Sequence, residues 1–182
     1  RRQKMYLSVL DQSPVLSGQG ARAAIEATLA LARRTEALGY RRYWLAEHHA
    51  IAALADPCPE VLLARLGAET KRMRVGTGGV LLPYYSAFRV AEAFRMLEAL
   101  YPGRIDLGIG RAPGSDAHTM YALQRDRRRG APDDFPDQLA ELLGYLDGTL
   151  PDDHPFRRLT ALPGLPEKPD LWLLGTSQQS AI

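Results

Sequence analysis

Apolar residues along this chain alternate between two spacings, the short apolar runs of buried strands and the three-to-four-residue repeat of helices. Runs at residues 6–10, 43–46 and 171–174 predict strands. An apolar stripe with helical spacing covers residues 21–38, and Gly39 follows it. Glycine readily takes the left-handed conformation of a helix C-terminus, so we expect the helix to end there.

The strongest pattern begins with an apolar strand at residues 74–81 that contains the pair Gly78-Gly79. Glycine lets the backbone approach a neighbour closely or adopt unusual dihedral angles. Pro83 stops the strand, and the spacing then changes to that of a helix over residues 86–101. The segment therefore starts as a strand, a glycine bend and a helix.

Another strand is predicted at residues 105–109, which completes a βαβ unit. Further helices are predicted at residues 59–70 and 135–146, with a long loop insertion at about 112–134. Five strands separated by helices imply the α/β class, with parallel pairing and right-handed crossovers. The pattern fits either an open doubly wound sheet or part of a (β/α)8 barrel, and a whole barrel takes about 250 residues.

Composition narrows the function classes. With 182 residues, 46% hydrophobic and 24% charged, the chain can bury a core as one large domain. The net charge of +2 gives no reason to expect nucleic acid, and the basic residues at 125 and 127–129 are interpreted as a solvated face. No apolar run approaches the roughly 20 residues that span a membrane. Residues 1–4 precede Met5 and are expected to be an upstream or vector extension.

The single cysteine, Cys58, excludes an internal disulfide and fits a reducing compartment, so we expect a cytoplasmic protein. Cys58 lies between two prolines and is expected to pack at a helix start, because no partnering base is evident for a nucleophile.

His48 is the main candidate for acid–base chemistry, because it follows a predicted strand and its imidazole can titrate near neutral pH. In both architectures ligands bind at the carboxyl ends of the strands. The alternative is a packing role, which we weigh more heavily for His49 than for His48. No metal site is predicted, since adjacent histidines on a strand point to opposite faces and no second cluster has ligand spacing.

A phosphate site is predicted at Gly175, Thr176, Ser177 and Ser180, where backbone N–H groups and hydroxyls meet a predicted helix N-terminus. A plain helix cap is the alternative. Arg111, directly after a strand, could pair with a phosphate or serve only in a surface salt bridge.

The glycine-rich strand ends also suggest a nicotinamide dehydrogenase, through Gly108-Ile109-Gly110. The third glycine of that fingerprint falls on Pro113, and the unit is fourth along the chain instead of first. We therefore disfavour this class. The pair Gly78-Gly79 could equally be a simple β-bulge.

Four segments taken in order carry a resemblance to a known family: LSVLDQSP, LGYRRYWLAEHH, RVGTGGVLLPYYSAFRVAEAFRMLEALYPGRIDLGIGRAPG and WLLGTSQQSA. Together they resemble the bacterial luciferase-like family of flavin-dependent monooxygenases. The resemblance covers essentially residues 5–182 and keeps the family's order and spacing.

The resemblance implies a (β/α)8 TIM barrel, of which residues 5–182 form the amino-terminal portion with about five βα units, a partial barrel. It implies reduced FMN supplied by a separate flavin reductase, or deazaflavin F420 in a sister branch. The implied reaction oxygenates a small organic substrate with O2 through a flavin C4a-hydroperoxide. The implied assembly is a homodimer through the helices at 59–70 and 86–101.

The resemblance also assigns roles to residues. His48 would lie near the flavin and support formation or reaction of the peroxide, and Gly78-Gly79 would bring backbone against the isoalloxazine ring, sometimes through a non-proline cis peptide. Gly175, Thr176 and Ser177 would cradle the FMN phosphate. Two alternatives stay open: an F420-dependent oxidoreductase of the same superfamily, or a non-catalytic flavin-binding partial barrel, since the first and fifth strands leave open edges. Such a chain is either a fragment of a longer polypeptide or completes itself with another copy.

Overall fold

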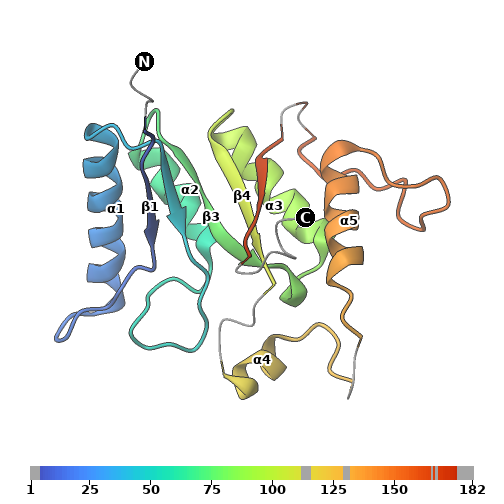
Figure 1. Ribbon diagram of the computed structural model, residues 1–182, viewed down its shortest axis with the longest axis horizontal. Coiled ribbons are helices and arrows are strands. Elements are labelled where there is room, and N and C mark those ends of the chain that lie inside the picture. Colours follow the sequence, from blue (N-terminus) through green and yellow to red (C-terminus); the bar gives the residue numbers. More distant parts are fainter. Residues whose placement is uncertain (1–4, 112–115, 129–131, 165, 167, 176–182) are drawn as a thin grey trace.

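The computed structural model describes residues 5–111, 116–128, 132–164, 166 and 168–175. Its centre is a five-stranded, fully parallel sheet in which the strands lie side by side in chain order (Figure 1). The strands are β1 Ser8–Asp11, β2 Arg42–Leu45, β3 Arg74–Leu81, β4 Ile105–Gly110 and β5 Asp170–Leu173. All five predicted strands are present, each within two residues of its expected bounds.

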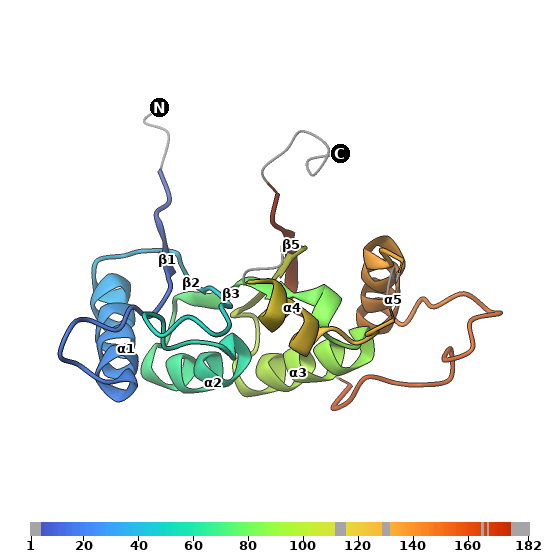
Figure 2. The ribbon, with the colours of Figure 1, turned by 90° about the horizontal axis from the view of Figure 1, so that it is seen from below.

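The helices cover one face of this sheet. Figure 2 shows α1, α2 and α3 side by side along that face, with α5 beside α3. Their bounds are α1 Ala21–Ala37, α2 Pro59–Glu69, α3 Ala87–Leu100, α4 Ala117–Leu123 and α5 Phe135–Asp147, and a short 3-10 turn, η1 Leu82–Tyr84, contains the proline that stops β3. Gly39 takes a φ of 83° just after α1, as the predicted helix end requires.

The strand order decides between the two architectures that the sequence left open. A doubly wound sheet reverses its strand order and places helices on both faces. Here spatial order equals chain order and the helices lie on one face, which is the arrangement of a barrel. The fold is therefore a partial (β/α)8 barrel, and the nicotinamide-type sheet is excluded.

The core fills the space between the sheet and its helices. Tyr43, Leu63 and Phe94 are among the largest buried side chains, and every residue of β4 is buried. Along β2 burial alternates, because Tyr43 and Leu45 face the helices while Arg42 and Trp44 face away from them. We call the side away from the helices the inner face, since it corresponds to a barrel interior.

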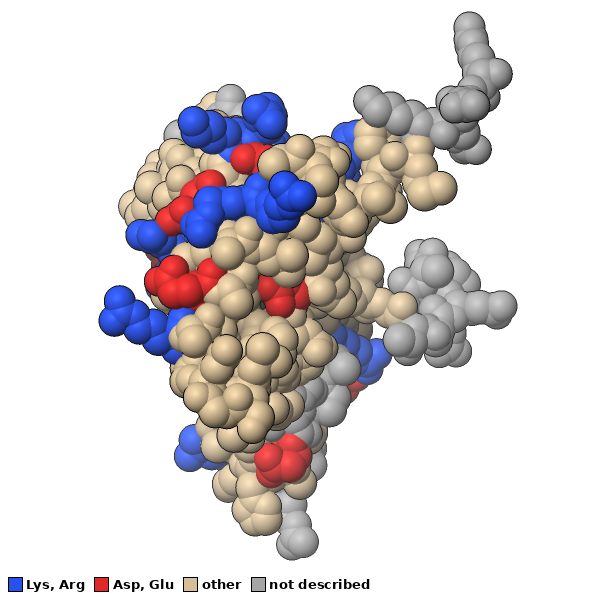
Figure 3. All heavy atoms as spheres, turned by 90° about the vertical axis from the view of Figure 1, so that its left-hand side faces the viewer, with Lys and Arg blue, Asp and Glu red and all other residues tan. Residues whose placement is uncertain are grey.

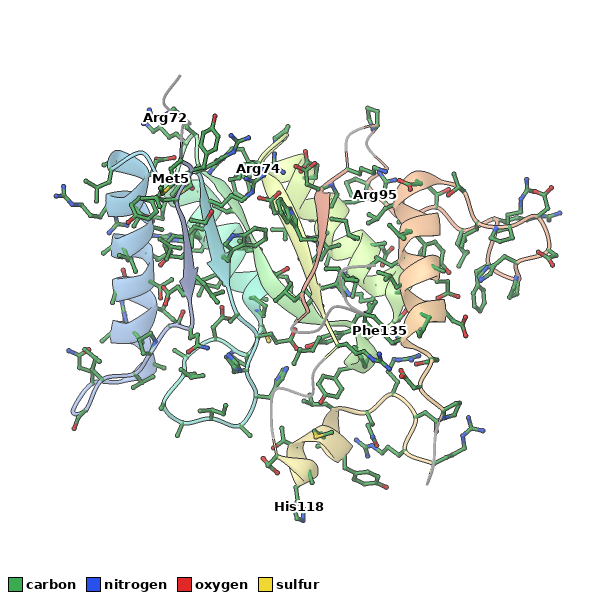
Figure 4. All side chains as sticks on the ribbon, in the orientation of Figure 1. Met5, Arg72, Arg74, Arg95, His118 and Phe135 are labelled. Carbon is green, nitrogen blue, oxygen red and sulfur yellow. The ribbon has the colours of Figure 1, made fainter. Side chains whose placement is uncertain are left out.

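A polar cluster occupies the inner face near the amino ends of the strands. Asp106, fully buried, accepts hydrogen bonds from Arg42 Nε at 3.0 Å, Arg74 Nη2 at 2.7 Å and Trp172 Nε1 at 3.1 Å. Figure 4 labels Arg74 at this end of the sheet. The Trp172 ring also meets Trp44 edge-to-face at 5.5 Å. One carboxylate thus connects three other strands through charged and indole donors.

The expected long loop at 112–134 was only partly right, because it contains the helix α4. Asp116 caps α4, with Oδ1 accepting from the backbone N–H of His118 at 2.9 Å. None of the α4 residues is buried, so the segment has no apolar stripe by which the sequence could have revealed a helix.

On the outside, acidic and basic side chains are interspersed over the side formed by β1 and α1 (Figure 3). Arg33 of α1 pairs with Glu69 of α2 at 2.6 Å. No helix within the described ranges is long and apolar enough to cross a bilayer.

Candidate active site at the carboxyl ends of the strands

The loops after β1 and β2 meet at the carboxyl ends of the strands. Gln12 Nε2 lies 3.2 Å from His48 Nε2, which pairs the predicted catalytic histidine with a side chain from the neighbouring loop. His48 is half-buried, so its ring is both held and accessible. With the Gln12 amide nitrogen as donor, Nε2 of a neutral His48 accepts and its proton lies on Nδ1.

A short antiparallel contact holds these two loops together. The N–H of Val15 donates to the Ala53 carbonyl at 2.8 Å, and the N–H of Ala55 donates to the Ser13 carbonyl at 2.9 Å. Pro14 and Leu54 form the bridge between them. The loop after β2 therefore folds back on the loop after β1, which the sequence did not indicate and which brings Gln12 to His48.

Glu47 separates the roles of the two histidines. It is almost fully buried, and its Oε1 accepts from the Tyr85 hydroxyl at 2.6 Å and contacts His49 Nε2 at 2.6 Å. Its Oε2 accepts from the backbone N–H of Leu81 at 2.9 Å, which ties β2 to the end of β3. Burial and the hydrogen bond to Glu47 raise the pKa of Tyr85. His49 thus lies against the buried Glu47, whereas His48 contacts Gln12.

The Gly78–Gly79 peptide is cis, and the register between β3 and β4 shifts between Thr77 and Val80. A Cβ atom at position 79 would lie 2.7 Å from the carbonyl oxygen of Gly108, and one at 108 would lie 2.0 Å from the carbonyl oxygen of Thr77. These two glycines are therefore required for the close approach of β3 to β4.

Gly78 is different because it faces side chains. A Cβ atom there would come 3.1 Å from Leu10 Cδ1 and 3.2 Å from Trp44 Cβ, both on the inner face. Gly78 is only half-buried. Because Gly78 has no side chain, the backbone between these two apolar side chains is left uncovered. Such a surface suits contact with a planar ring.

Two further buried acids lie in this region, Asp11 at the end of β1 and Asp56 in the loop after β2, and nothing in the sequence indicated the burial of Asp56. Asp11 accepts from the Ser13 N–H at 2.8 Å and from the Tyr43 hydroxyl at 2.5 Å. Asp56 accepts from the Cys58 N–H through Oδ1 at 3.2 Å, while its buried Oδ2 has no hydrogen-bond partner within the described part of the chain. Burial, together with the nearby Glu60, Asp11 and Glu47, raises the pKa of Asp56 to about 7.

Arg111 lies directly after β4 and is largely exposed. Its guanidinium pairs with Asp133 and lies 5.6 Å from the centre of the Phe135 ring. The surface salt bridge considered for it is thus present, and its contact with a phosphate stays a prediction. Gly175 is exposed near the end of β5, whereas Thr176, Ser177 and Ser180 lie outside the described residues. Among the described residues, no group of three or more His, Cys, Asp or Glu could hold a metal ion.

Comparison with known proteins identifies the family. The family model for luciferase-like monooxygenases matches residues 5–182. A luciferase-like monooxygenase of Escherichia coli is 47% identical over 96% of this chain and 50% of its own length. The N-acetyl-S-alkylcysteine monooxygenase of Bacillus subtilis is 43% identical over 97% of this chain and 52% of its own length. The chain therefore spans about half the length of these relatives.

Solved structures have a similar fold over most of this chain. The crystal structure of apo-MsnO8 is 47% identical, covers 98% of this chain and 52% of its own, and superposes with a TM-score of 0.86. More distant structures share the fold. One is the oxygenating constituent of 3,6-diketocamphane monooxygenase from Pseudomonas putida in complex with FMN, which is 22% identical over 78% of this chain and 38% of its own and has a TM-score of 0.65. An F420-dependent secondary alcohol dehydrogenase has 16% identity, 98% and 55% coverage and a TM-score of 0.70. The chain belongs to the luciferase-like monooxygenase family.

Proposed function

We propose that this protein is a flavin-dependent monooxygenase that uses reduced FMN and O2 to oxygenate a small organic substrate. Family membership and the monooxygenase relatives support the reaction class. The observation that carries the proposal is the pairing of Gln12 with His48 at the carboxyl ends of the strands, where a barrel of this kind performs its chemistry.

The residues present fit a flavin. Gly78 offers a flat stretch of backbone on the inner face, where any side chain would crowd Leu10 and Trp44. The permanently charged guanidinium of Arg111 would serve the phosphate, because a surface ion pair such as that with Asp133 is weak enough to be exchanged. Gly175, with Thr176, Ser177 and Ser180, would supply backbone N–H groups and hydroxyls to the same phosphate.

Bound reduced FMN supplies the two electrons that activate O2; one oxygen atom enters the substrate and the other leaves as water. His48 would hold or move a proton at Nε2, with Gln12 fixing the ring orientation. Gly79 keeps β3 against β4, and Gly78 would thereby be held beside the cofactor ring. The buried Glu47 anchors the end of β3 under this site.

The partners follow from the reaction. A separate flavin reductase would deliver reduced FMN, and the natural gene product would act in the cytoplasm as a homodimer through the helices at 59–70 and 86–101.

The second candidate is an F420-dependent oxidoreductase, which the fold of the alcohol dehydrogenase favours. The third is a flavin-binding partial barrel without activity, which the half-length match favours.

The test uses the natural gene product with FMN, F420, a flavin reductase and NADH. We expect reduced FMN to bind in a fluorescence or absorbance titration, F420 to bind more weakly, and oxygenated product to form only when the reductase and the organic substrate are both present. Tighter binding of F420 would favour the second candidate, and FMN binding without oxygenated product would favour the third.

The role of His48 is tested by His48→Ala, with His118→Ala as the control because His118 lies on the exposed helix α4 (Figure 4). General acid–base residues typically contribute 10²–10⁴ in rate, so we expect His48→Ala to lower kcat about 100-fold or more. His118→Ala should leave kcat unchanged. Equal turnover by the two variants would remove His48 from its proposed role.

A further inference from the structure

Asp56 stands out among the acids near His48 because it is only partly satisfied. Its side chain belongs to a residue that is 3% exposed, and one carboxyl oxygen accepts from the Cys58 N–H while the other has no partner in the described chain. Burying an ionised carboxylate with one bare oxygen is far more costly than burying a neutral carboxyl group.

The neighbouring acids make ionisation of Asp56 still less favourable. Asp11 receives two hydrogen bonds, and Glu47 contacts three partners. Glu60, at the start of α2, is a third acidic neighbour. Cys58 is the remaining titratable group next to Asp56. A charge on Asp56 would add a like charge to this group, and the donor that its carboxylate meets among the described residues is the Cys58 N–H.

The position of Asp56 links it to His48. Its backbone carbonyl accepts from the His48 N–H at 3.4 Å, and its Oδ1 caps the chain at Cys58, just before α2. Asp56 therefore joins the two ends of the loop that carries His48 and fastens that loop to a helix.

We infer that Asp56 is a positioning residue for His48 and that it does this in its neutral, protonated form. The inference deepens the proposed function, because it rests on the proposed role of His48. Asp56 does not touch the reacting atoms. In the neutral form it keeps the loop that carries His48 packed close to Asp11 and Glu47. Its ionisation would repel that loop from these two acids and weaken the contact between Gln12 and His48.

The pH dependence follows in two steps. The folded pKa of about 7 is raised from the ordinary 3.8, so the unfolded chain releases this proton first. Stability is therefore lost progressively as pH rises from about 4 to about 7. Above pH 7 Asp56 also ionises in the folded protein, and the loop with His48 loosens there.

The experiment compares the natural gene product with Asp56→Asn, which keeps the shape and the Oδ1 acceptor but cannot ionise. Asp153→Asn, in an exposed loop, is the matched control. We expect the wild-type Tm to fall between pH 4 and 7 and its kcat/KM to fall above pH 7. Asp56→Asn should flatten both profiles over these ranges, and Asp153→Asn should follow the wild type. Unchanged profiles in Asp56→Asn would overturn the inference.

A spectroscopic readout separates this inference from the proposed function. In ¹⁵N–¹H NMR, the ring signals of His48 should show a pH-dependent step in the wild type that follows the ionisation of Asp56 and is absent from Asp56→Asn. If His48→Ala leaves turnover intact while these signals still follow Asp56, the catalytic role proposed for His48 fails and the positioning role of Asp56 stands. If the signals ignore Asp56 while His48→Ala is inactive, the inference alone fails. Should Asp56→Asn not fold, Asp56→Ser offers a smaller neutral acceptor for the Cys58 N–H.

Discussion

At the scale of single residues, neighbouring positions of the same type have different tasks. Gly78 faces side chains on the inner face, whereas Gly79 faces the backbone of β4. His48 meets Gln12 from the next loop, whereas His49 lies against the buried Glu47. Each pair offers a matched experiment, because one member tests the site and the other tests the scaffold.

The glycine pair gives the first prediction. Gly79→Ala would place a Cβ 2.7 Å from a backbone oxygen that has no freedom to move, so we expect a loss of about 2 kcal/mol or more in the free energy of unfolding. Gly78→Ala crowds only side-chain atoms and should cost about 1 kcal/mol or less. Urea denaturation measures both.

The same two variants also test the flavin site. Gly78→Ala should fold and yet bind reduced FMN more weakly, because its methyl group would project onto the face proposed for the ring. Unaltered FMN affinity in a folded Gly78→Ala variant would argue against that placement.

The sequence was sufficient to select His48 but insufficient to find Asp56. His48 follows an apolar strand, and residues in that place face the ligand end of a parallel sheet. Asp56 lies between Ala55 and Pro57 and looks like an ordinary loop residue. Its burial depends on the antiparallel contact between two loops, and no local pattern encodes that contact. Glu47 is similar, since its partners Leu81 and Tyr85 are 34 and 38 residues away.

At the scale of elements, the end of α1 organises the turn that starts β3. Glu36 Oε1 accepts from the backbone N–H groups of Arg72 at 2.7 Å and Met73 at 2.8 Å, and also from Lys71. Burial alone would raise the pKa of Glu36, but these N–H groups and the charge of Arg104 lower it overall. One carboxylate thus connects α1 to the strand that carries the glycine bend.

Glu36→Gln should therefore destabilise the fold by about 1–2 kcal/mol at pH 7, since a neutral amide accepts these N–H groups less strongly. Because the folded pKa is lowered, this contribution is complete above the ordinary value of 4.5 and is lost as pH falls through the folded pKa. Wild type and variant should converge in urea denaturation at acid pH. Glu26→Gln, on the same helix, is the control, and a difference that persists in acid would contradict the assignment.

The regular elements were predictable because their apolar periodicity is strong. Five strands and four of the helices follow from it, and their ends differ from prediction by one or two residues. The exception is α4, whose stability comes from its Asp116 cap and local hydrogen bonds instead of a buried stripe. Apolar periodicity cannot predict a helix of this kind.

At the scale of the whole molecule, the surface of α2 and α3 bears on assembly. Val61 on α2 and Met96 and Leu100 near the end of α3 are each more than half exposed. Exposed apolar side chains on adjacent helices can form part of an interface. They are consistent with the proposed homodimer.

We expect Met96→Glu combined with Leu100→Glu to convert a dimer to a monomer in analytical ultracentrifugation, because each buried charge would oppose association. Leu31→Glu, an exposed apolar position on α1, is the control and should stay dimeric. Dimerisation unaffected by the double change would place the interface elsewhere.

The sequence pattern did not distinguish a barrel from a doubly wound sheet, since both repeat the same βα unit. What separates them is the spatial order of the strands, a property of long-range pairing. The family resemblance supplied the answer that periodicity lacked, and the pairing of each strand with its neighbour in the chain confirms it.

The cluster around Asp106 fills one end of the inner face with side chains. Arg42, Arg74 and Trp172 converge on that carboxylate near the amino ends of the strands, and Trp44 closes the gap beside them. Across these strands the amino end of the inner face is thus filled by side chains. For the proposed reaction, O2, substrate and product would therefore have to enter and leave at the carboxyl ends of the strands, and the order in which they do so would become part of the kinetics.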